Sequence, residues 1–328
     1  KAPSYFSPYG NHYAELIDKR NYLLERMRTA KVITQTEYES AVKEKPKIQL
    51  FQETIAAPHF VIMVRDYLIK KYGEDMIQNG GLRVVTTLDT GLQKIAEETV
   101  EKYAKINTER YKASNAALVS ADPKTGQILA MVGSKDYFGK PEPEGCTPGD
   151  NCKFEGNFNV ATAFRQPGSS FKPFAYAEAF KKGFTDSTII FDLPTEFNPS
   201  CNSSALQEKD DTGQDCYNPQ NYDGRFRGPV TMRQALGQSL NLPSVKTLYL
   251  AGVDGTIDLA HQMGITTLND RSRYGLSLVL GGGEVKLVDM VSAYGVFAND
   301  GTRVAPAFVQ KVVAADGTVL EEYKKEEE

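Results

Sequence analysis

The sequence predicts an α+β fold in which an antiparallel sheet is flanked by helices. Residues 116–120 and 127–132 have strand character and are joined by the turn Asp122-Pro123-Lys124-Thr125-Gly126, which is the pattern of a β-hairpin. Segments with apolar residues at helical spacing occur before and after this hairpin. A length of 328 residues, with 41% hydrophobic and 24% charged residues, suggests about two domains of ordinary globular composition.

The part of the chain before the hairpin is predicted to be mostly helical. Residues 1–9 form a proline-rich turn, residues 20–27 have helical periodicity, and Thr34-Gln35-Thr36-Glu37 matches a capping box that begins a second helix. Linker composition, rich in Lys, Pro and Gln, starts at residue 46. The further elements are an amphipathic helix at 59–68, a strand rich in β-branched residues at 80–89, and a helix from its cap at Asp89 to Tyr103.

The part after the hairpin is predicted to contain further helices. One helix covers residues 174–182 and is ended by Gly183. The run Gly281-Gly282-Gly283 lacks the spacing of phosphate-binding glycine motifs, so it predicts a tight turn. The remaining elements are helices at 253–263 and 285–299, a turn at 315–317 that follows the residues 309–313, and a solvated charge run at 324–328.

Ser169 and Lys172 are the first candidate catalytic pair. Pro173 is tolerated only in the first turn of a helix, so Ser169 is expected at or just before a helix N-terminus. A separation of three residues places the two side chains on one face of a helical turn. Lysine can accept the proton of a serine nucleophile if burial lowers its pKa, and the flanking Phe171 and Phe174 could supply that burial.

A second motif, Ser239-Leu240-Asn241, follows downstream of the first. Ser-x-x-Lys followed by Ser-x-Asn is the order found in penicillin-binding proteins and serine β-lactamases. The chain resembles the transpeptidase part of a class A penicillin-binding protein, with the tail of the glycosyltransferase domain before it. The segments that carry the resemblance are 121–133, 165–173, 217–222 and 292–301.

The resemblance implies the penicillin-binding transpeptidase fold, similar to the serine β-lactamases, and acyl transfer in two steps. Ser169 would attack the penultimate D-Ala carbonyl of a peptidoglycan stem peptide, and β-lactams would trap it as an acyl-enzyme. Lys172 would be the base for acylation, Ser239 would relay the proton to the leaving group, and Asn241 would bind the donor's amide and position Lys172. No cofactor is implied.

The resemblance also implies a domain organisation and a location. Residues 1–45 are similar to the tail of the glycosyltransferase domain, 46–112 to an inter-domain linker, and 113–328 to an incomplete transpeptidase domain. The first residues resemble the middle of a longer protein, so a membrane anchor is expected upstream. The expected location is extracytoplasmic, with stem peptides, β-lactams and other cell-wall synthesis proteins as partners.

The third motif of the family, Lys-Thr-Gly on a strand downstream of the second, does not occur after Asn241 in these residues. Lys124-Thr125-Gly126 spells it, but in a hairpin turn before the nucleophile. The polypeptide is therefore expected to show one hairpin with an exposed edge, and weak or no turnover. The alternatives are a non-catalytic penicillin-binding scaffold or sensor, a D,D-carboxypeptidase, or a serine β-lactamase.

Cysteine usage is consistent with an extracytoplasmic family. Cys146 and Cys152 bracket one polar loop and Cys201 and Cys216 bracket another, and four cysteines allow three pairings. Loop neighbours are the residues that meet most easily, and the family works where disulfides persist, which favours bonds within each pair. Four free loop thiols are the alternative.

Other features exclude function classes or imitate motifs. A net charge of -4 argues against nucleic-acid binding, and no run of eighteen apolar residues spans a bilayer. The three histidines have no metal-ligand spacing and are expected to be structural or on the surface. Ser40-Ala41-Val42-Lys43 and Ser200-Cys201-Asn202 imitate the first two motifs, and they are predicted to lie on a surface helix and in a loop.

Overall fold

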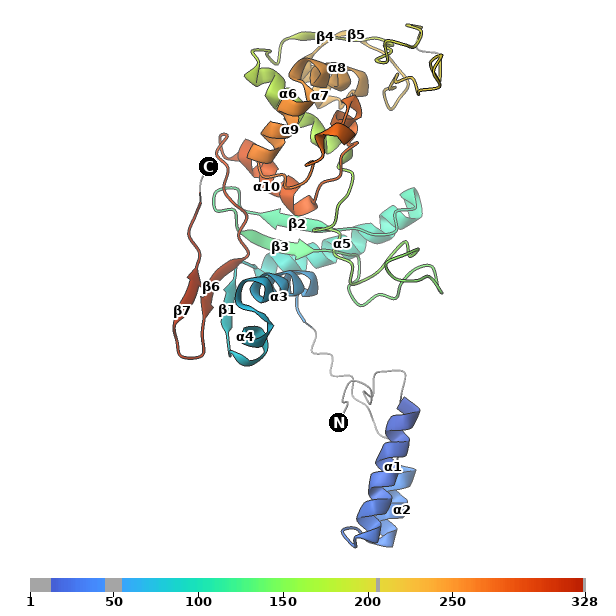
Figure 1. Cartoon of the computed structure of the whole chain (residues 1–328), viewed down its shortest axis with the longest axis vertical. Coiled ribbons are helices and arrows are strands. Elements are labelled where there is room, and N and C mark those ends of the chain that lie inside the picture. The colour runs from blue at the N-terminus through green and yellow to red at the C-terminus, as the bar shows by residue number, and fades with distance from the viewer. Residues whose placement is uncertain (1–12, 45–54, 205–206, 327–328) are drawn as a thin grey trace. The chain divides into compact units, whose positions relative to one another are not determined.

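The computed structural model describes residues 13–44, 55–204 and 207–326 (Figure 1), and the chain divides into two compact units, Lys1–Ala56 and Ala57–Glu328. Three predicted features lie wholly or partly outside the described residues. They are the turn at 1–9, the start of the linker at 46–54, and the last two residues of the charge run, 327–328. None of the described helices is long and apolar enough to cross a membrane.

The first unit contains the predicted helical hairpin, formed by α1 (Tyr13–Thr29) and α2 (Gln35–Lys43). The capping box is confirmed, because Thr34 Oγ1 accepts a hydrogen bond from Glu37 N at 3.3 Å and Glu37 Oε2 accepts one from Thr34 N at 2.7 Å. No residue of α2 is buried, so this helix has no core face of its own.

The second unit contains a three-stranded antiparallel sheet in the order β1-β6-β7. Its strands are β1 (Arg83–Thr86), β6 (Val309–Val313) and β7 (Val319–Glu322), and beside it lie α3 (Pro58–Tyr72) and α4 (Glu74–Asn79) (Figure 1). Glu321 ties this sheet to α3, because its carboxylate accepts hydrogen bonds from Tyr67 OH at 2.7 Å and Tyr72 OH at 3.0 Å.

The predicted hairpin is formed by β2 (Leu118–Ala121) and β3 (Ile128–Val132), with α5 (Thr90–Tyr111) packed against β3 (Figure 1). Gln93 of α5 satisfies the backbone of Met131, since its Oε1 accepts from Met131 N at 2.8 Å and its Nε2 donates to Met131 O at 3.1 Å. Among the described residues, β3 is the only strand that pairs with β2.

The helical part of this unit carries the predicted motifs. Its elements are η1 (Gly168–Phe171), α6 (Lys172–Lys181), β4 (Ile189–Asp192), β5 (Gly228–Thr231), α7 (Met232–Gly237), α8 (Asn241–Ala251), α9 (Val253–Gln262), η2 (Arg271–Arg273), η3 (Leu276–Leu280) and α10 (Leu287–Ala298). The apolar faces of η1, α6, α8, α9, η3 and α10 share one core, in which Phe171, Phe174 and Leu248 are fully buried. This core fixes the start of α6 against α8 and η3. The strands β4 and β5 and helix α7 pack in a second cluster, which includes Tyr176 and Ala179 of α6.

The α+β class is confirmed, and the bounds of several predicted elements differ from those in the structure. The helix that begins at Asp89 continues beyond Tyr103 to Tyr111, because Ala104 is still buried and the backbone turns left-handed only at Lys112. The strand predicted at 80–89 is confined to Arg83–Thr86. The described residues also form more than the expected single hairpin, because the segments at both ends of this unit pair with each other.

Candidate active site

Lys172 is buried at the first position of α6, with its side chain 1% exposed. Pro173 follows in the first turn, where its missing N–H has no helical partner to lose. Phe171 and Phe174, both fully buried, surround this turn with apolar surface, as the sequence predicts. The local sequence therefore places a basic side chain in a site with little water.

The ammonium group of Lys172 reaches three oxygen atoms. Nζ donates to Ser239 O at 2.6 Å, to Asn241 Oδ1 at 2.9 Å and to Ser239 Oγ at 3.2 Å. Burial lowers the pKa of Lys172 to about 8, because the charged form loses its hydration. Within the described residues, no acidic side chain forms an ion pair with it.

Ser169 lies in η1, three residues before Lys172, and its side chain is exposed. In the described part of the chain its hydroxyl makes no hydrogen bond, so it is open to a reaction partner. The adjacent backbone is held by Tyr294 of α10, whose OH donates to Ser170 O at 2.8 Å. The structure thus brings Lys172, Ser239 and Asn241 into direct contact and presents Ser169 at the start of the same helix.

Ser239 has a left-handed backbone, with a φ of 52°, between α7 and α8. Its N–H donates to Leu236 O and the N–H of Leu240 donates to Ala235 O, both at 2.9 Å. These two bonds are those of a Schellman helix end, in which glycine usually occupies the left-handed position. The Cβ atom of a serine at this position is sterically unfavourable, so the backbone of Ser239 is strained. Backbone strain of this kind is concentrated at functional sites.

Asn241 is oriented by the segment that resembles the family at 217–222. Its Nδ2 donates to Gln220 O at 2.8 Å, which leaves Oδ1 facing Lys172 Nζ. Its backbone N donates to Asn221 Oδ1 at 2.8 Å. The sequence marks this segment only as a landmark, and we could not assign Gln220 or Asn221 a role from it.

The glycine run at 281–283 packs against the segment that precedes Ser169. It forms the predicted tight turn, with Gly281 at a φ of 93°, and a Cβ on Gly281 would lie 2.3 Å from Gly168 N. Arg165 and Val285 exchange two backbone hydrogen bonds, both 2.9 Å long. The backbone before Ser169 is therefore packed directly against this turn, a contact that no local pattern indicates.

A cavity of ≈ 690 Å³ opens beside the nucleophile segment. Its lining includes Gln166, Pro167 and Ser170 on one side and Ala116 at the start of the hairpin. Phe154, which follows the first cysteine loop, lines it as well. The cavity is therefore lined by Ser170, the residue that follows the exposed Ser169.

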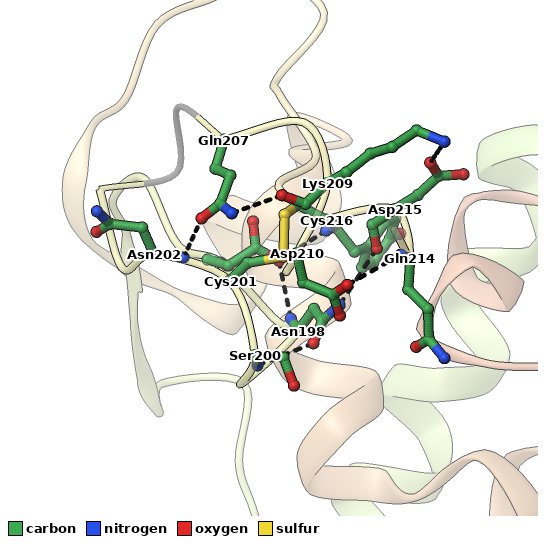
Figure 2. Close-up of a disulfide and its surroundings, with 12 residues drawn as sticks. Asn198, Ser200, Cys201, Asn202, Gln207, Lys209, Asp210, Gln214, Asp215 and Cys216 are labelled. Carbon is green, nitrogen blue, oxygen red and sulfur yellow. Dashed lines mark hydrogen bonds and ion pairs between the residues drawn. A yellow bond between two sulfur atoms is a disulfide. The ribbon is translucent and has the colours of Figure 1, made fainter. Parts of the chain in front are cut away.

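Both predicted disulfides are confirmed, with S–S distances of 2.02 Å for Cys146 and Cys152 and 1.98 Å for Cys201 and Cys216. Figure 2 shows the second one beside Asp210, whose Oδ1 accepts a hydrogen bond from Gln214 N at 2.9 Å. This disulfide closes the loop that ends one residue before the segment at 217–222.

The three segments that only resemble the family's motifs lie where the sequence predicts them. Ser40 and Lys43 are on α2, which has no buried residue, and Lys124-Thr125-Gly126 is in the turn between β2 and β3. Ser200-Cys201-Asn202 is in the second disulfide loop (Figure 2).

Two of the histidines have structural partners, and the third, at position 12, lies outside the described residues. The ring of His59 bonds to Ser134 Oγ, and that of His261 to Thr267 O. The one described cluster of potential metal ligands contains Glu196 and two cysteines, and both cysteines are consumed by a disulfide.

The comparisons with known proteins agree with the motifs. The family model for the penicillin binding protein transpeptidase domain matches residues 116–328. Penicillin-binding protein 2D of Bacillus subtilis is 32% identical over 98% of this chain and 42% of its own length. Penicillin-binding protein 1A of Aquifex aeolicus is 29% identical over 98% of this chain and 51% of its own length. The chain thus spans about half the length of these relatives.

Solved structures share the fold. Penicillin-binding protein 1A from Haemophilus influenzae matches 99% of this chain and 58% of its own, with a TM-score of 0.65 at 24% identity. PonA1 from Mycobacterium tuberculosis matches 81% of this chain and 63% of its own, with a TM-score of 0.63 at 27% identity.

Proposed function

The chain belongs to the penicillin-binding protein transpeptidases of class A, and on this premise we propose that it cross-links peptidoglycan by acyl transfer through Ser169. The observation that carries this proposal is the environment of Lys172. This buried amine donates to Ser239 and Asn241 and follows the exposed Ser169 by three residues. The four residues together provide a nucleophile, a base and two groups that position the base.

In the proposed acylation step, Ser169 Oγ attacks the penultimate D-Ala carbonyl of a stem peptide and its proton passes to Lys172. The C–N bond to the terminal D-Ala then breaks, and Ser239 gives its hydroxyl proton to the leaving amine while it takes a proton from Lys172, whose Nζ lies 3.2 Å from its Oγ. One hydrogen of Asn241 Nδ2 is bonded to Gln220 O, so the other can donate to the donor peptide. An amine of a neighbouring strand finally attacks the acyl carbon, the ester bond to Ser169 Oγ breaks, and the proton lost by the amine returns to Ser169 Oγ through Lys172.

The protonation state of Lys172 supports its assignment as the base. A pKa of about 8 leaves about a tenth of the amine neutral at pH 7, against well under a thousandth for an ordinary lysine. The neutral amine retains two hydrogens for Ser239 and Asn241 and offers its lone pair to the serine proton.

The alternative to the proposed enzyme is a non-catalytic penicillin-binding scaffold or sensor. Release of D-Ala from a stem-peptide donor separates the two, since a scaffold or sensor releases none.

We also propose the wider organisation of the protein. Residues 1–45 would be the end of a glycosyltransferase domain, 46–112 a linker and 113–328 the transpeptidase domain, with a membrane anchor upstream. Two disulfides support an extracytoplasmic location, where such bonds persist. The partners would be stem peptides, β-lactams and other cell-wall synthesis proteins.

The function is tested by intact-mass measurement after incubation with a penicillin, followed by peptide mapping. We expect one adduct, on Ser169, that is absent from Ser169→Ala. The neighbouring Ser170→Ala is the matched control and should keep the adduct, because the hydroxyl of Ser170 is bonded to Pro167 O. A folded protein without an adduct, or an adduct that persists in Ser169→Ala, would contradict the proposal.

A further inference from the structure

A buried carboxylate lies behind the candidate site. Asp192, the last residue of β4, is 0% exposed. Its oxygens accept hydrogen bonds from Asn221 Nδ2 at 2.9 and 3.0 Å, and Oδ2 also accepts from Arg227 N at 3.0 Å. Both carboxylate oxygens of Asp192 accept from Nδ2, so the NH2 group of Asn221 faces Asp192.

This constraint fixes the other half of the Asn221 side chain, which is 4% exposed. Nδ2 uses its remaining capacity on Arg225 O at 2.8 Å. Oδ1 therefore faces α8, where it accepts from Asn241 N at 2.8 Å and from Leu242 N at 3.4 Å. These are the first two N–H groups of α8, which have no partner within the helix.

The chain places a second contact next to the first. Gln220 O, on the residue before Asn221, accepts from Asn241 Nδ2 at 2.8 Å. Consecutive residues thus hold both the backbone and the side-chain amide of Asn241. With its NH2 group turned to Gln220 O, Asn241 presents Oδ1 to Lys172 Nζ at 2.9 Å.

We propose that Asp192 and Asn221 are positioning residues for acylation, which hold Asn241 so that its carbonyl oxygen faces Lys172. Neither touches Lys172 itself, and each acts through Asn241. The link to acylation rests on the proposed function, whereas the link to Lys172 can be measured without any reaction.

The direct test is to titrate Lys172 and to monitor the titration by NMR, in protein labelled with ¹³C at lysine Cε. The Lys172 signal is assigned by its absence from the spectrum of Lys172→Arg. Burial is the cause of the lowered pKa of Lys172, with no charged side chain contributing, so the wild-type midpoint should lie near 8. Asn221→Ala frees Asn241 and removes an acceptor from the ammonium group. The midpoint should then fall by about one pH unit.

Asp192→Asn provides a second variant that leaves every contact of Asn241 chemically intact. It should lower the midpoint in the same direction but by less, because Asn221 keeps a weaker partner. The exchange Asp192→Asn with Asn221→Asp rebuilds one donor and one acceptor between the two positions. The midpoint of this double variant should return to the wild-type value or exceed it, since the carboxylate moves closer to Lys172.

The matched control is Asp289→Asn on α10. Asp289 is also a buried acid, 7% exposed, and its Oδ2 accepts from Thr266 N at 3.0 Å. This variant should lose stability without moving the Lys172 midpoint, which separates positioning from a general loss of structure.

Acylation by penicillin gives the second measurement. The second-order rate for Asn221→Ala should fall about ten- to a hundredfold, because the base is no longer held in place. If the Lys172 midpoint falls in Asn221→Ala and Asp192→Asn as expected but the wild-type protein takes no penicillin, the proposed function is contradicted and the link from these two residues to Lys172 stands. If Asn221→Ala and Asp192→Asn both titrate like the wild type, the positioning role is refuted, whatever the reactivity.

Discussion

Replacing Ser239 with glycine should stabilise the protein while it removes a hydroxyl group from the candidate active site. Ser239 has a φ of 52° at a helix end where glycine is the usual residue. Its Oγ lies 3.2 Å from Lys172 Nζ. The backbone at this position therefore favours glycine, and the site chemistry favours serine. Ser239→Ala is the matched variant, since it loses the hydroxyl but keeps the Cβ atom.

The size of the gain follows from two opposing terms. The left-handed conformation costs a residue with a Cβ atom about 1–2 kcal/mol. Glycine loses about 0.5–1 kcal/mol more than alanine in conformational entropy on folding. The difference favours Ser239→Gly over Ser239→Ala by about 0.5–1 kcal/mol in the free energy of unfolding. For an ordered region of this size, that corresponds to a Tm higher by roughly 1–4 °C.

Thermal unfolding followed by circular dichroism measures this difference, and the rate of penicillin acylation measures the loss of the hydroxyl. Both variants should react more slowly than the wild type and at similar rates, because both lack Oγ. Equal Tm values for the two variants would show that Ser239 carries no backbone strain. A Ser239→Gly protein that reacts at the wild-type rate would show that its hydroxyl has no part in acylation.

Three further predictions concern other parts of the fold. Gly281→Ala places a Cβ atom 2.3 Å from Gly168 N at a φ of 93°, so urea unfolding should show a loss of about 2–4 kcal/mol and acylation should slow; unchanged stability would contradict the close packing. Burial lowers the pKa of His59 to about 4, so the unfolded chain takes up a proton at a higher pH than the folded protein does. The contribution of His59 to the free energy of unfolding is fully present above about pH 6.5, and the free energy of unfolding should fall by about 3 kcal/mol as the pH drops to 4. The His59→Gln protein should lack this part of the pH dependence, and an identical profile would refute it. Replacing Cys201 and Cys216 by serine opens a loop with a separation of 15 residues and should cost about 3 kcal/mol, against about 2 kcal/mol for the disulfide with a separation of 6; equal losses would contradict the loop-length argument.

Local physics explains what we could predict from the sequence. Helix capping at Thr34 and Asp89 depends on residues within one turn, so a short pattern was enough to find both helix starts. The hairpin at 116–132 was found from its turn and its strand composition. The end of the helix after Asp89 was missed by eight residues, because the burial of residues on one side of this helix comes from tertiary packing, as Ala96 and Val100 show by packing against the hairpin.

The positioning contacts could not be predicted in the same way. Asn221 and Asp192 are 29 residues apart in the chain, and Asn221 and Asn241 are 20 apart. Periodicity and propensity describe neighbours within a few residues, so they carry no information about which distant polar groups meet. The approach of Gly281 to Gly168 was missed for the same reason.

The sequence by itself determined the identity and local order of the reactive groups. Ser169 and Lys172 share the start of one helix because Pro173 and the residues after it allow no other beginning for that helix. Only the tertiary structure decided how Lys172 is placed. Its burial, its lowered pKa and its three oxygen partners depend on segments nearly 70 residues away that the shared core of α6 and α8 brings together. Desolvation and hydrogen-bond direction are properties of that packing, and so the reactivity of the pair is set by the fold.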